Sequence, residues 1–345
     1  MLDFKQDISI ARFFSYILLA AIGMAFFISG CILLIDPYHI WRKKALGGIN
    51  EIRLEIPHFS QTGAALLNSV LHTPEVLILG SSRVRRGFNE TLASRLYGAK
   101  VQVTGIDALS LSAAKGMFFN ISKKTHLKKL YLEVNYMTSN DCKASDEAQT
   151  GENNRAYQFY PRDAAMQSVE TLRVNLFGLR GFDKYVDKQG RYHDNPSGAA
   201  SRAKNMQKEE INYNGFFQET ASHCKYNPGN AADIQDLTDI FKLAQANNTE
   251  VVLLLLPATA TWQARIRKAG LASTIAQWNI NVSQLALQFH ATLLDYERCN
   301  DFPATAKPMP LFWDDTHFSN RIGDHLLGEM LVADKVVAEK RQPSK

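Results

Sequence analysis

Two short motifs, far apart in the sequence, carry residue types that suit nucleophilic catalysis. The segment 311–323, LFWDDTHFSNRIG, contains the adjacent acids Asp314 and Asp315 followed by His317. The segment 80–82, GSS, follows a short apolar run and supplies two hydroxyls. A serine hydroxyl becomes a good nucleophile when an imidazole accepts its proton, and a carboxylate on the other ring nitrogen fixes the tautomer and stabilises the imidazolium. The residue types therefore indicate acyl transfer through a serine, provided that the fold joins the two segments.

The pattern between the motifs predicts alternating strands and helices. The run EVLILG at 75–80 is short, apolar and ends in glycine, which is typical of a buried parallel strand. Further strands are expected at 101–107, 128–136, 250–257 and 291–297, and helices at 62–71, 89–98, 110–124, 233–248 and 261–289, with a last helix from Asn320. Strands that alternate with helices form βαβ units. The sequence therefore predicts an α/β fold with three layers, α/β/α, around a mainly parallel five-stranded sheet.

The carboxyl ends of the predicted strands place further polar groups near the two motifs. Open α/β sheets bind ligands beyond these ends, and the first three strands end near Ser82, Gly105 and Asn135. A tetrahedral oxyanion needs preset donors, and the N–H groups of Ser82 and Gly105 and the Asn135 amide are candidates. Glycine at 105 would let the backbone approach the reacting carbonyl. Plainer interpretations stay open: Gly-Ser-Ser as a helix cap, Gly105 as a bend and Asn135 as a turn cap.

Serine, glycine, asparagine and Asp-x-x-His at successive strand ends resemble the SGNH (GDSL-like) hydrolase superfamily, whose fold is flavodoxin-like. The resemblance spans most of residues 75–335. With an apolar segment near the N-terminus, the chain is also similar to the membrane-anchored bacterial branch, which includes proteins acting in alginate O-acetylation and in D-alanyl transfer to teichoic acid. The resemblance implies Ser82 as nucleophile and His317 as base. It implies transfer or removal of an acyl group on an extracytoplasmic polysaccharide.

The motifs also depart from the family pattern. The usual Gly-Asp-Ser is Gly-Ser-Ser here, so Ser81 stands where an aspartate is common and remains an alternative nucleophile. The third block is reduced to Glu-Val-Asn at 133–135, which makes the assignment of Asn135 less specific. The acid is ambiguous: Asp314 fits the Asp-x-x-His spacing and is our first choice, and Asp315 fits the Asp-x-His-aromatic motif of the alginate proteins.

Three arginines follow the predicted nucleophile at positions 83, 85 and 86. They are expected either to form a solvated helix entrance or to give an electropositive rim that attracts an anionic polymer. In the second interpretation, Arg83 and Arg85 bind substrate. The histidines outside the motif show no metal-ligand spacing, so we assign no metal and no cofactor.

Residues 13–35 form a run of 23 residues without a charge. At a rise of about 1.5 Å per residue, such a helix crosses a hydrocarbon core of roughly 30 Å. A signal peptide is the main competitor, although the run is longer than the usual apolar region and no A-x-A-like cleavage site follows. The stretch 28–31, ISGC, resembles a lipobox that would make Cys31 a lipidated N-terminus, but apolar residues continue past it. We predict one transmembrane helix.

The charges that flank this span do not settle its orientation, because the bias is small and long domains translocate regardless of it. The resemblance places the protein in the bacterial inner membrane with its domain in the periplasm or outside the cell. The expected organisation is a flank at 1–12, the span, a juxtamembrane connector at 36–74, the domain at 75–335 and a polar tail at 336–345. The polar segment 138–232 lacks sustained periodicity and is interpreted as an insertion over the sheet edge.

Composition excludes some partners. The formal net charge of +5 is not gathered into basic runs, and there are no zinc-spaced cysteines, so nucleic acid is not an expected partner. An acyl donor, a polysaccharide acceptor and the membrane are expected. A membrane-bound partner that exports acyl groups is a further hypothesis, because acetyl groups must reach the outside. Outside the span lie Cys142, Cys224 and Cys299, for which a disulfide between the first two and three reduced thiols are both open.

Overall fold

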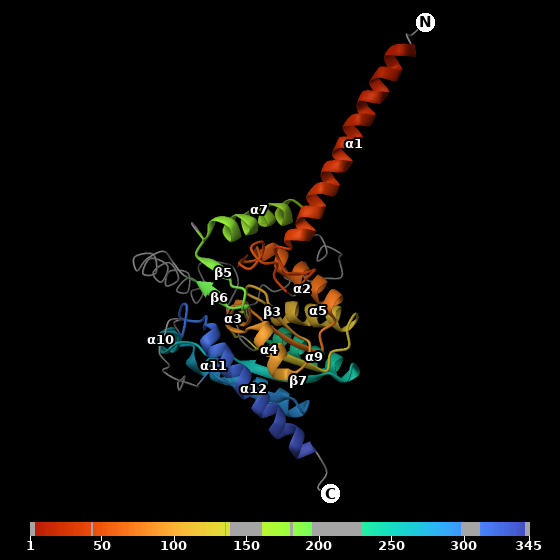
Figure 1. The fold of residues 1–345 in the computed structure, drawn as a ribbon. Coiled ribbons are helices and arrows are strands. Elements are labelled where there is room, and N and C mark those ends of the chain that lie inside the picture. Colours follow the sequence, from red (N-terminus) through yellow and green to blue (C-terminus); the bar gives the residue numbers. More distant parts are fainter. Residues whose placement is uncertain are drawn as a thin grey trace. The chain divides into compact units, whose positions relative to one another are not determined.

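The computed structural model describes residues 4–42, 44–134, 136–138, 161–179, 182–194, 230–297 and 311–341 (Figure 1). The chain divides into two compact units. One unit consists of Met1–Leu54 and Phe159–Gly181, and the other of Glu55–Gln158 and Phe182–Lys345. Cys142, Cys224 and Cys299 lie outside the described residues, and so does Asn135.

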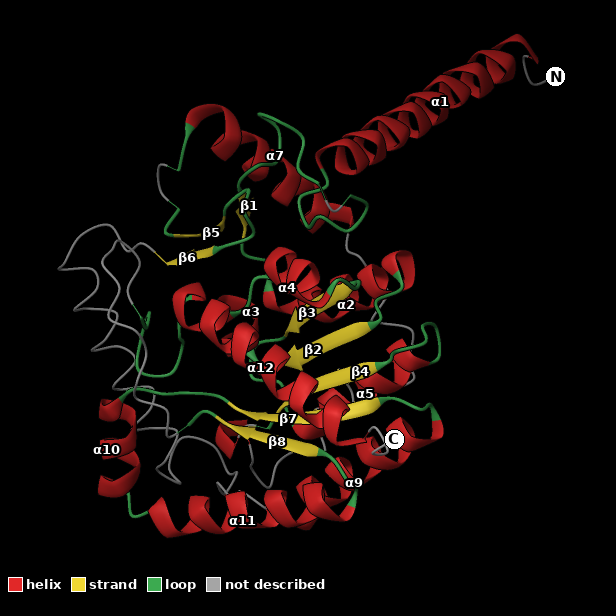
Figure 2. Cartoon of the chain, turned by 60° about the horizontal axis from the view of Figure 1, so that its bottom comes forward, coloured by secondary structure: helices red, strands yellow, loops and turns green. Residues whose placement is uncertain are grey.

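The second unit is built on a five-stranded sheet in which neighbouring strands are parallel (Figure 2). The spatial order is β3 (Val101–Gly105), β2 (Val76–Gly80), β4 (Lys129–Glu133), β7 (Glu250–Leu255) and β8 (Thr292–Asp295). The predicted α/β fold with a five-stranded parallel sheet is therefore confirmed. In the register, Gly80 lies opposite Gly105, so the first two predicted strand ends are neighbours at the same edge.

Helices cover both faces of this sheet. Side chains alternate along β2, so Leu77 and Leu79 join one apolar core while Val76 and Ile78 join the other. The first core includes residues of α2 (His58–His72), α5 (Leu111–Ser122), α9 (Ala231–Ala246), α10 (Ala260–Lys268) and α11 (Ala272–Gln288). The second includes residues of α3 (Ser82–Gly87), α4 (Glu90–Tyr97) and α12 (Asn320–Arg341). This arrangement gives the three predicted layers.

Some elements differ from the sequence prediction. The long helix expected at 261–289 is two helices, α10 and α11, because Gly270 adopts a left-handed φ of +72° between them. The short helix α3 was expected only in the plainer interpretation, in which Gly-Ser-Ser caps a helix, and Ser81 is indeed its N-cap. The segment 138–232 is not irregular throughout: it contains α7 (Pro161–Phe177) and the antiparallel pair β5 (Lys184–Val186) and β6 (Tyr192–Asp194). A 3₁₀ turn also follows β4 at Tyr136–Thr138.

The first unit contains α1 (Phe4–Ile35), the two-residue strand β1 (Arg53–Leu54) and α7. Within α1, residues Arg12–Ile35 form the stretch of the described chain that is long and apolar enough to cross a membrane, with a mean hydropathy of 2.6. Almost all side chains of this stretch are exposed. The predicted apolar helix is therefore present over the predicted residues.

Candidate active site

The serine turn, residues 81–83, joins β2 to α3. Ser81 is the N-cap of α3, and its Oγ accepts a hydrogen bond of 3.2 Å from the N–H of Arg83. Gly80 has no room for a side chain, since a Cβ there would lie 2.5 Å from Oε2 of Glu133. The tight passage from strand to helix places Ser82 at the first helical position, beyond the carboxyl end of β2.

The histidine loop, residues 311–319, folds back on itself before α12. The N–H of Trp313 donates to the His317 carbonyl at 2.8 Å, and Phe312 forms a β-bridge with Phe318. Inside the loop, Oδ1 of Asp314 accepts from the N–H of His317 at 2.7 Å and from the N–H of Thr316 at 2.8 Å. These bonds fix the aspartate relative to the histidine three residues later.

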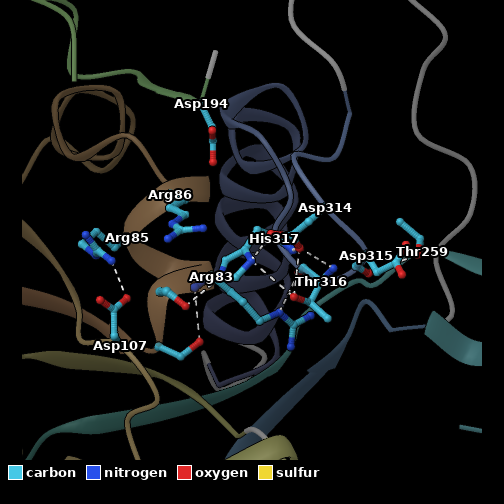
Figure 3. Close-up of polar contacts among 12 residues, drawn as sticks. Arg83, Arg85, Arg86, Asp107, Asp194, Thr259, Asp314, Asp315, Thr316 and His317 are labelled. Carbon is cyan, nitrogen blue, oxygen red and sulfur yellow. Dashed lines mark hydrogen bonds and ion pairs between the residues drawn. The ribbon is translucent and has the colours of Figure 1, made fainter. Parts of the chain in front are cut away.

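The two segments meet in a line of two hydrogen bonds. Oγ of Ser82 lies 2.7 Å from Nε2 of His317. Nδ1 of His317 lies 2.6 Å from Oδ2 of Asp314 (Figure 3). The His317 side chain is 14% exposed and that of Asp314 is 6% exposed. The line is therefore largely shielded from water, with the carboxylate as its more deeply buried end.

Close packing between α3 and α12 brings the segments together. A Cβ on Gly87 would lie 1.9 Å from the Phe318 ring, and a Cβ on Gly323 would lie 1.9 Å from the carbonyl oxygen of Gly87. The Asn320 amide also donates to that carbonyl at 2.8 Å. Both glycines are needed for this approach, and neither was singled out from the sequence, where isolated helical glycines give no sign of their partner.

The electrostatics favour a neutral imidazole beside an ionised carboxylate. Burial lowers the pKa of His317 below its usual value, and nearby Arg86 lowers it further, while the charge of Asp314 acts in the opposite direction. Burial would raise the pKa of Asp314, but the charge of His317 and the hydrogen bonds within the loop hold that pKa well below its usual range. At neutral pH the imidazole can therefore accept a proton from Ser82.

The structure separates the alternative residues from this line. Ser81 donates to Oε1 of Glu133 through its Oγ at 3.1 Å and to Oε2 through its N–H at 2.6 Å. Asp315 faces another way: its carboxylate accepts from the Thr259 hydroxyl at 3.2 Å and pairs with Arg265 at 3.1 Å. Of the two candidate acids, Asp314 is the one that contacts the imidazole.

Arg83 points into the protein, which corrects the expectation that it binds substrate. Its side chain is 5% exposed. Its guanidinium donates to the carbonyls of Leu256 at 2.6 Å, Pro257 at 2.7 Å and Thr316 at 3.1 Å, and it lies 3.4 Å from a Glu133 carboxylate oxygen. Arg83 thus links the serine turn, the ends of β4 and β7 and the histidine loop.

Glu133 was quoted as part of a motif but was not recognised as part of the site. The available signal was an acid directly after the apolar residues of a strand, because buried carboxylates are rare unless they are paired. Here the Glu133 side chain is 1% exposed and holds Ser81 and Arg83.

The other arginines near the line are already paired. Arg85 forms ion pairs with Glu55 at 2.6 Å and with Asp107 (Figure 3). Arg86 lies 3.4 Å from Glu55, and its guanidinium is 5.5 Å from the centre of the Tyr192 ring. These residues therefore do not form an uncompensated electropositive rim. To bind substrate, Arg85 would have to leave Glu55 and Asp107 or share them with the substrate.

Gly105 lies against the serine turn. A Cβ on Gly105 would be 2.4 Å from the Arg85 nitrogen and 2.6 Å from the Ser81 carbonyl oxygen, so only glycine allows this approach. This close packing places the end of β3 against the Ser81 carbonyl and the first turn of α3. In the described part of the chain, no group of three or more His, Cys, Asp or Glu side chains could hold a metal ion.

No protein-family model and no curated protein matches the chain. Among solved structures, a catalytic mutant of an acetylxylan esterase from Geobacillus stearothermophilus aligns with a TM-score of 0.37 and 11% identity, over 75% of this chain and 92% of that chain. A GDSL-like lipase from Bacteroides thetaiotaomicron aligns with a TM-score of 0.39 and 13% identity, over 81% of this chain and 99% of that chain. These likenesses are remote, so an assignment of function rests on the geometry of Ser82, His317 and Asp314.

Proposed function

We propose that this protein is a membrane-anchored, extracytoplasmic acyltransferase of the SGNH type that transfers an acyl group, in our proposal acetyl, to a hydroxyl of a cell-surface or secreted polysaccharide. The observation that carries the proposal is the line from Ser82 Oγ through the His317 imidazole to the Asp314 carboxylate, with bonds of 2.7 and 2.6 Å. This arrangement of hydroxyl, imidazole and carboxylate is the one that serine acyl transfer requires.

In the first half-reaction, Ser82 attacks the carbonyl carbon of an acyl donor while Nε2 of His317 accepts the hydroxyl proton. The tetrahedral intermediate collapses as its bond to the leaving group breaks, and His317 gives the proton to that group. An acyl ester of Ser82 remains. Asp314 stabilises the imidazolium that exists between the two proton transfers. The backbone N–H groups of Ser82 and Gly105 and the Asn135 amide are the proposed donors to the oxyanion.

In the second half-reaction, a sugar hydroxyl attacks the acyl-Ser82 ester. His317 accepts the proton of that hydroxyl and returns a proton to Ser82 as the serine leaves. Water could attack in the same way, and the protein would then be an esterase with the same three residues. Transfer is favoured in our proposal by the resemblance to the anchored acyltransferase branch and by the apolar helix α1, which would hold the site close to a membrane-bound source of acyl groups.

The membrane part of the proposal is supported by α1. Its segment Arg12–Ile35 is apolar and lies unburied in the structure. A helix of about 24 residues and about 36 Å can span a hydrocarbon core of roughly 30 Å. We propose a single pass in a bacterial inner membrane, with the sheet domain outside the cytoplasm and a membrane-bound exporter supplying the acyl group. Protease accessibility in spheroplasts tests the orientation: a domain that is protected until lysis faces the cytoplasm.

The acyl transfer itself is tested with the full chain in lipid nanodiscs. A chromogenic acetyl ester is supplied with and without an oligosaccharide acceptor, and the products are separated as acetate and acetylated sugar. The expected result is acetylated sugar that depends on Ser82. Release of acetate alone would replace the transferase with an esterase. If Ser82→Ala leaves polymer acylation in cells unchanged, the protein binds or organises the polymer rather than acylating it.

A further inference from the structure

Helix α7 exposes most of its large apolar side chains, and most of its buried side chains are small. The side chains of Met166, Val169, Leu176 and Phe177 are each more than half exposed. The buried positions of the same helix are Ala164, Ser168, Thr171 and Val174. A helix on the surface of a water-soluble domain shows the opposite pattern, with its large apolar residues toward the core. The exposed face of α7 therefore lacks its partner in the described part of the chain.

The charged residues on the exposed face of α7 do not change its mainly apolar character. Arg173 projects from the same face, but its Nε donates to Glu170 one turn earlier at 2.7 Å. The pair partly offsets its own charge and leaves the four apolar side chains as the main feature of the face. A contiguous apolar patch of this kind marks a surface that meets another apolar body.

The opposite face of α7 packs against α1, and both helices belong to the same unit. Figures 1 and 2 both show α7 beside the carboxyl-terminal end of α1. Small residues such as Ala164 and Ser168, four apart, allow close approach of helices, as they do between helices in membranes. Asn175 also ties α7 to the chain after α1 by exchanging hydrogen bonds with the backbone of Ile52 at 2.8 and 2.9 Å.

The end of α1 has the features of a membrane–water boundary. The Asp36 carboxylate accepts from the N–H groups of Ile40 and Arg42, both at 2.8 Å, which stops the helix in a tight turn. The Arg42 guanidinium reaches back to the last carbonyls of α1, including that of Leu33 at 2.8 Å. The Trp41 side chain is exposed beside it. Arginine at the end of an apolar helix and an exposed tryptophan are both typical of the interface.

We propose that α7 lies in the plane of the membrane interface, with Met166, Val169, Leu176 and Phe177 inserted among lipid acyl chains next to the exit of α1. This inference rests on the proposed membrane span of α1. Because the apolar part of α1 continues to Ile35 and α7 packs beside that end, the exposed face of α7 sits at the depth where an interfacial helix buries its apolar residues. The continuity of the two apolar surfaces is the reason to choose lipid over a protein partner.

The test measures lipid exposure directly in the full chain. Single cysteines are introduced by Val169→Cys and Phe177→Cys in a background where Cys31, Cys142, Cys224 and Cys299 are replaced by serine. Each cysteine carries a nitroxide, and the protein is placed in vesicles of phosphatidylethanolamine and phosphatidylglycerol. Relaxation by oxygen, which concentrates in lipid, is compared with relaxation by a water-soluble nickel chelate. The expected result is that oxygen dominates at both α7 positions.

Two matched controls accompany these labels. Phe26→Cys reports the exposed surface of α1, and Leu287→Cys reports an equally exposed apolar residue on α11 of the other unit. Oxygen should dominate at 26 and the nickel chelate at 287. Circular dichroism shows that each variant is folded, and Met166→Cys replaces either α7 variant that fails this check.

The outcomes separate the two proposals. Nickel accessibility at 26 would show that α1 does not span the membrane, and the proposed position of α7 would then be wrong as well. Lipid exposure at 26 together with nickel accessibility at 169 and 177 would leave the span in place and overturn the interfacial position of α7. Protection from both reagents at 169 and 177 would also overturn it, because a protein surface, from a second copy or another membrane protein, would then cover the face.

Discussion

The serine turn and the histidine loop each contain two identical neighbouring residues: Ser81 and Ser82, and Asp314 and Asp315. In each pair the two side chains have different partners. In the serine turn, the position of each serine relative to the start of α3 determines which partners it has. Ser81 is the N-cap and its side chain turns back to the N–H of Arg83, whereas Ser82 is already helical and reaches His317. The strong preference of serine for N-cap positions is a rule that a sequence can carry.

In the histidine loop the separation depends on distant partners. Asp314 is held by N–H groups within its own loop and contacts His317. Asp315 is held by Thr259 and Arg265, which lie after β7 and on α10. Neither acid is favoured by local rules, so the choice is made by tertiary structure. In each pair, one residue lies in the hydrogen-bonded line that includes His317 and the other fixes its segment to the domain.

The largest expected effect separates the two serines. Ser82→Ala should abolish labelling by a fluorophosphonate and lower the rate of acyl transfer by about 10⁶-fold, the loss expected when a serine nucleophile is removed. Ser81→Ala should keep the labelling and lose about 1 kcal/mol of stability with the N-cap. Mass spectrometry of the labelled peptide and thermal unfolding measure both. Labelling that survives in Ser82→Ala and disappears in Ser81→Ala would reverse the roles.

The next effect separates the two acids. Asp314→Asn should lower kcat by about 10⁴-fold, because the amide no longer holds the imidazole in the tautomer that accepts the Ser82 proton. Asp315→Asn makes the same change at a carboxylate whose partners are Thr259 and Arg265, so its effect on kcat should be much smaller. Kinetics on an acetyl ester test the pair. Equal losses of kcat in the two variants would show that Asp314 is not the acid that acts on His317 alone.

These two pairs show how far the sequence could lead. The parallel sheet followed from short apolar runs that alternate with helical patterns, since such runs are buried on both faces. Ser82, His317 and Asp314 followed from their residue types and from the rule that parallel strands end at one edge. The role of Asp315 was left open because it depends on Thr259, more than 50 residues away in the chain. Ser81 was kept as an alternative nucleophile although its N-cap position is a local feature.

Other features had no local signal. The close contact between Gly87 and Gly323 depends on two helices that are more than 200 residues apart. Arg83 was assigned to substrate because an arginine after a catalytic serine is indistinguishable, in sequence, from one that turns inward. The inverted face of α7 was missed because its apolar residues are interrupted by polar ones on both sides, and the pattern becomes visible only when burial shows which face is outside.

A smaller effect tests Glu133. This residue contacts the serine turn directly and is linked to the histidine loop through Arg83. Glu133→Gln keeps the shape of the side chain but leaves Arg83 without its buried carboxylate, which should cost about 3–5 kcal/mol of stability. Displacement of the serine turn should slow labelling of Ser82 by up to about 10²-fold. Chemical unfolding and labelling rates measure the two effects. Glu75→Gln is the matched control, because Glu75 pairs with the exposed Lys128 and its loss should leave the unfolding midpoint unchanged.

If Glu133→Gln is as mild as Glu75→Gln, the buried pair does not hold the two segments together. If stability falls and the labelling rate per folded molecule does not, Glu133 supports the domain without positioning Ser82. A labelling rate that falls in the folded fraction, and recovers partly in Glu133→Asp, is the result expected of a positioning residue.

The smallest effect is a shift in the pH dependence of kcat/KM. It tests how the charged groups around His317 change the pKa of that side chain. Activity requires neutral His317, so kcat/KM should rise with pH through the pKa of that group and reach a plateau above it. Burial lowers this pKa, so the midpoint should lie below the ordinary value of 6.5.

Arg86 also lowers the pKa of His317, because its positive charge disfavours the imidazolium. Arg86→Gln should therefore raise the midpoint, whereas Asp314→Asn, which removes a charge that favours the imidazolium, should lower it further. A midpoint at or above 6.5 in the unmodified protein, or shifts of the same sign in the two variants, would show that the group being titrated is not His317 in its buried position.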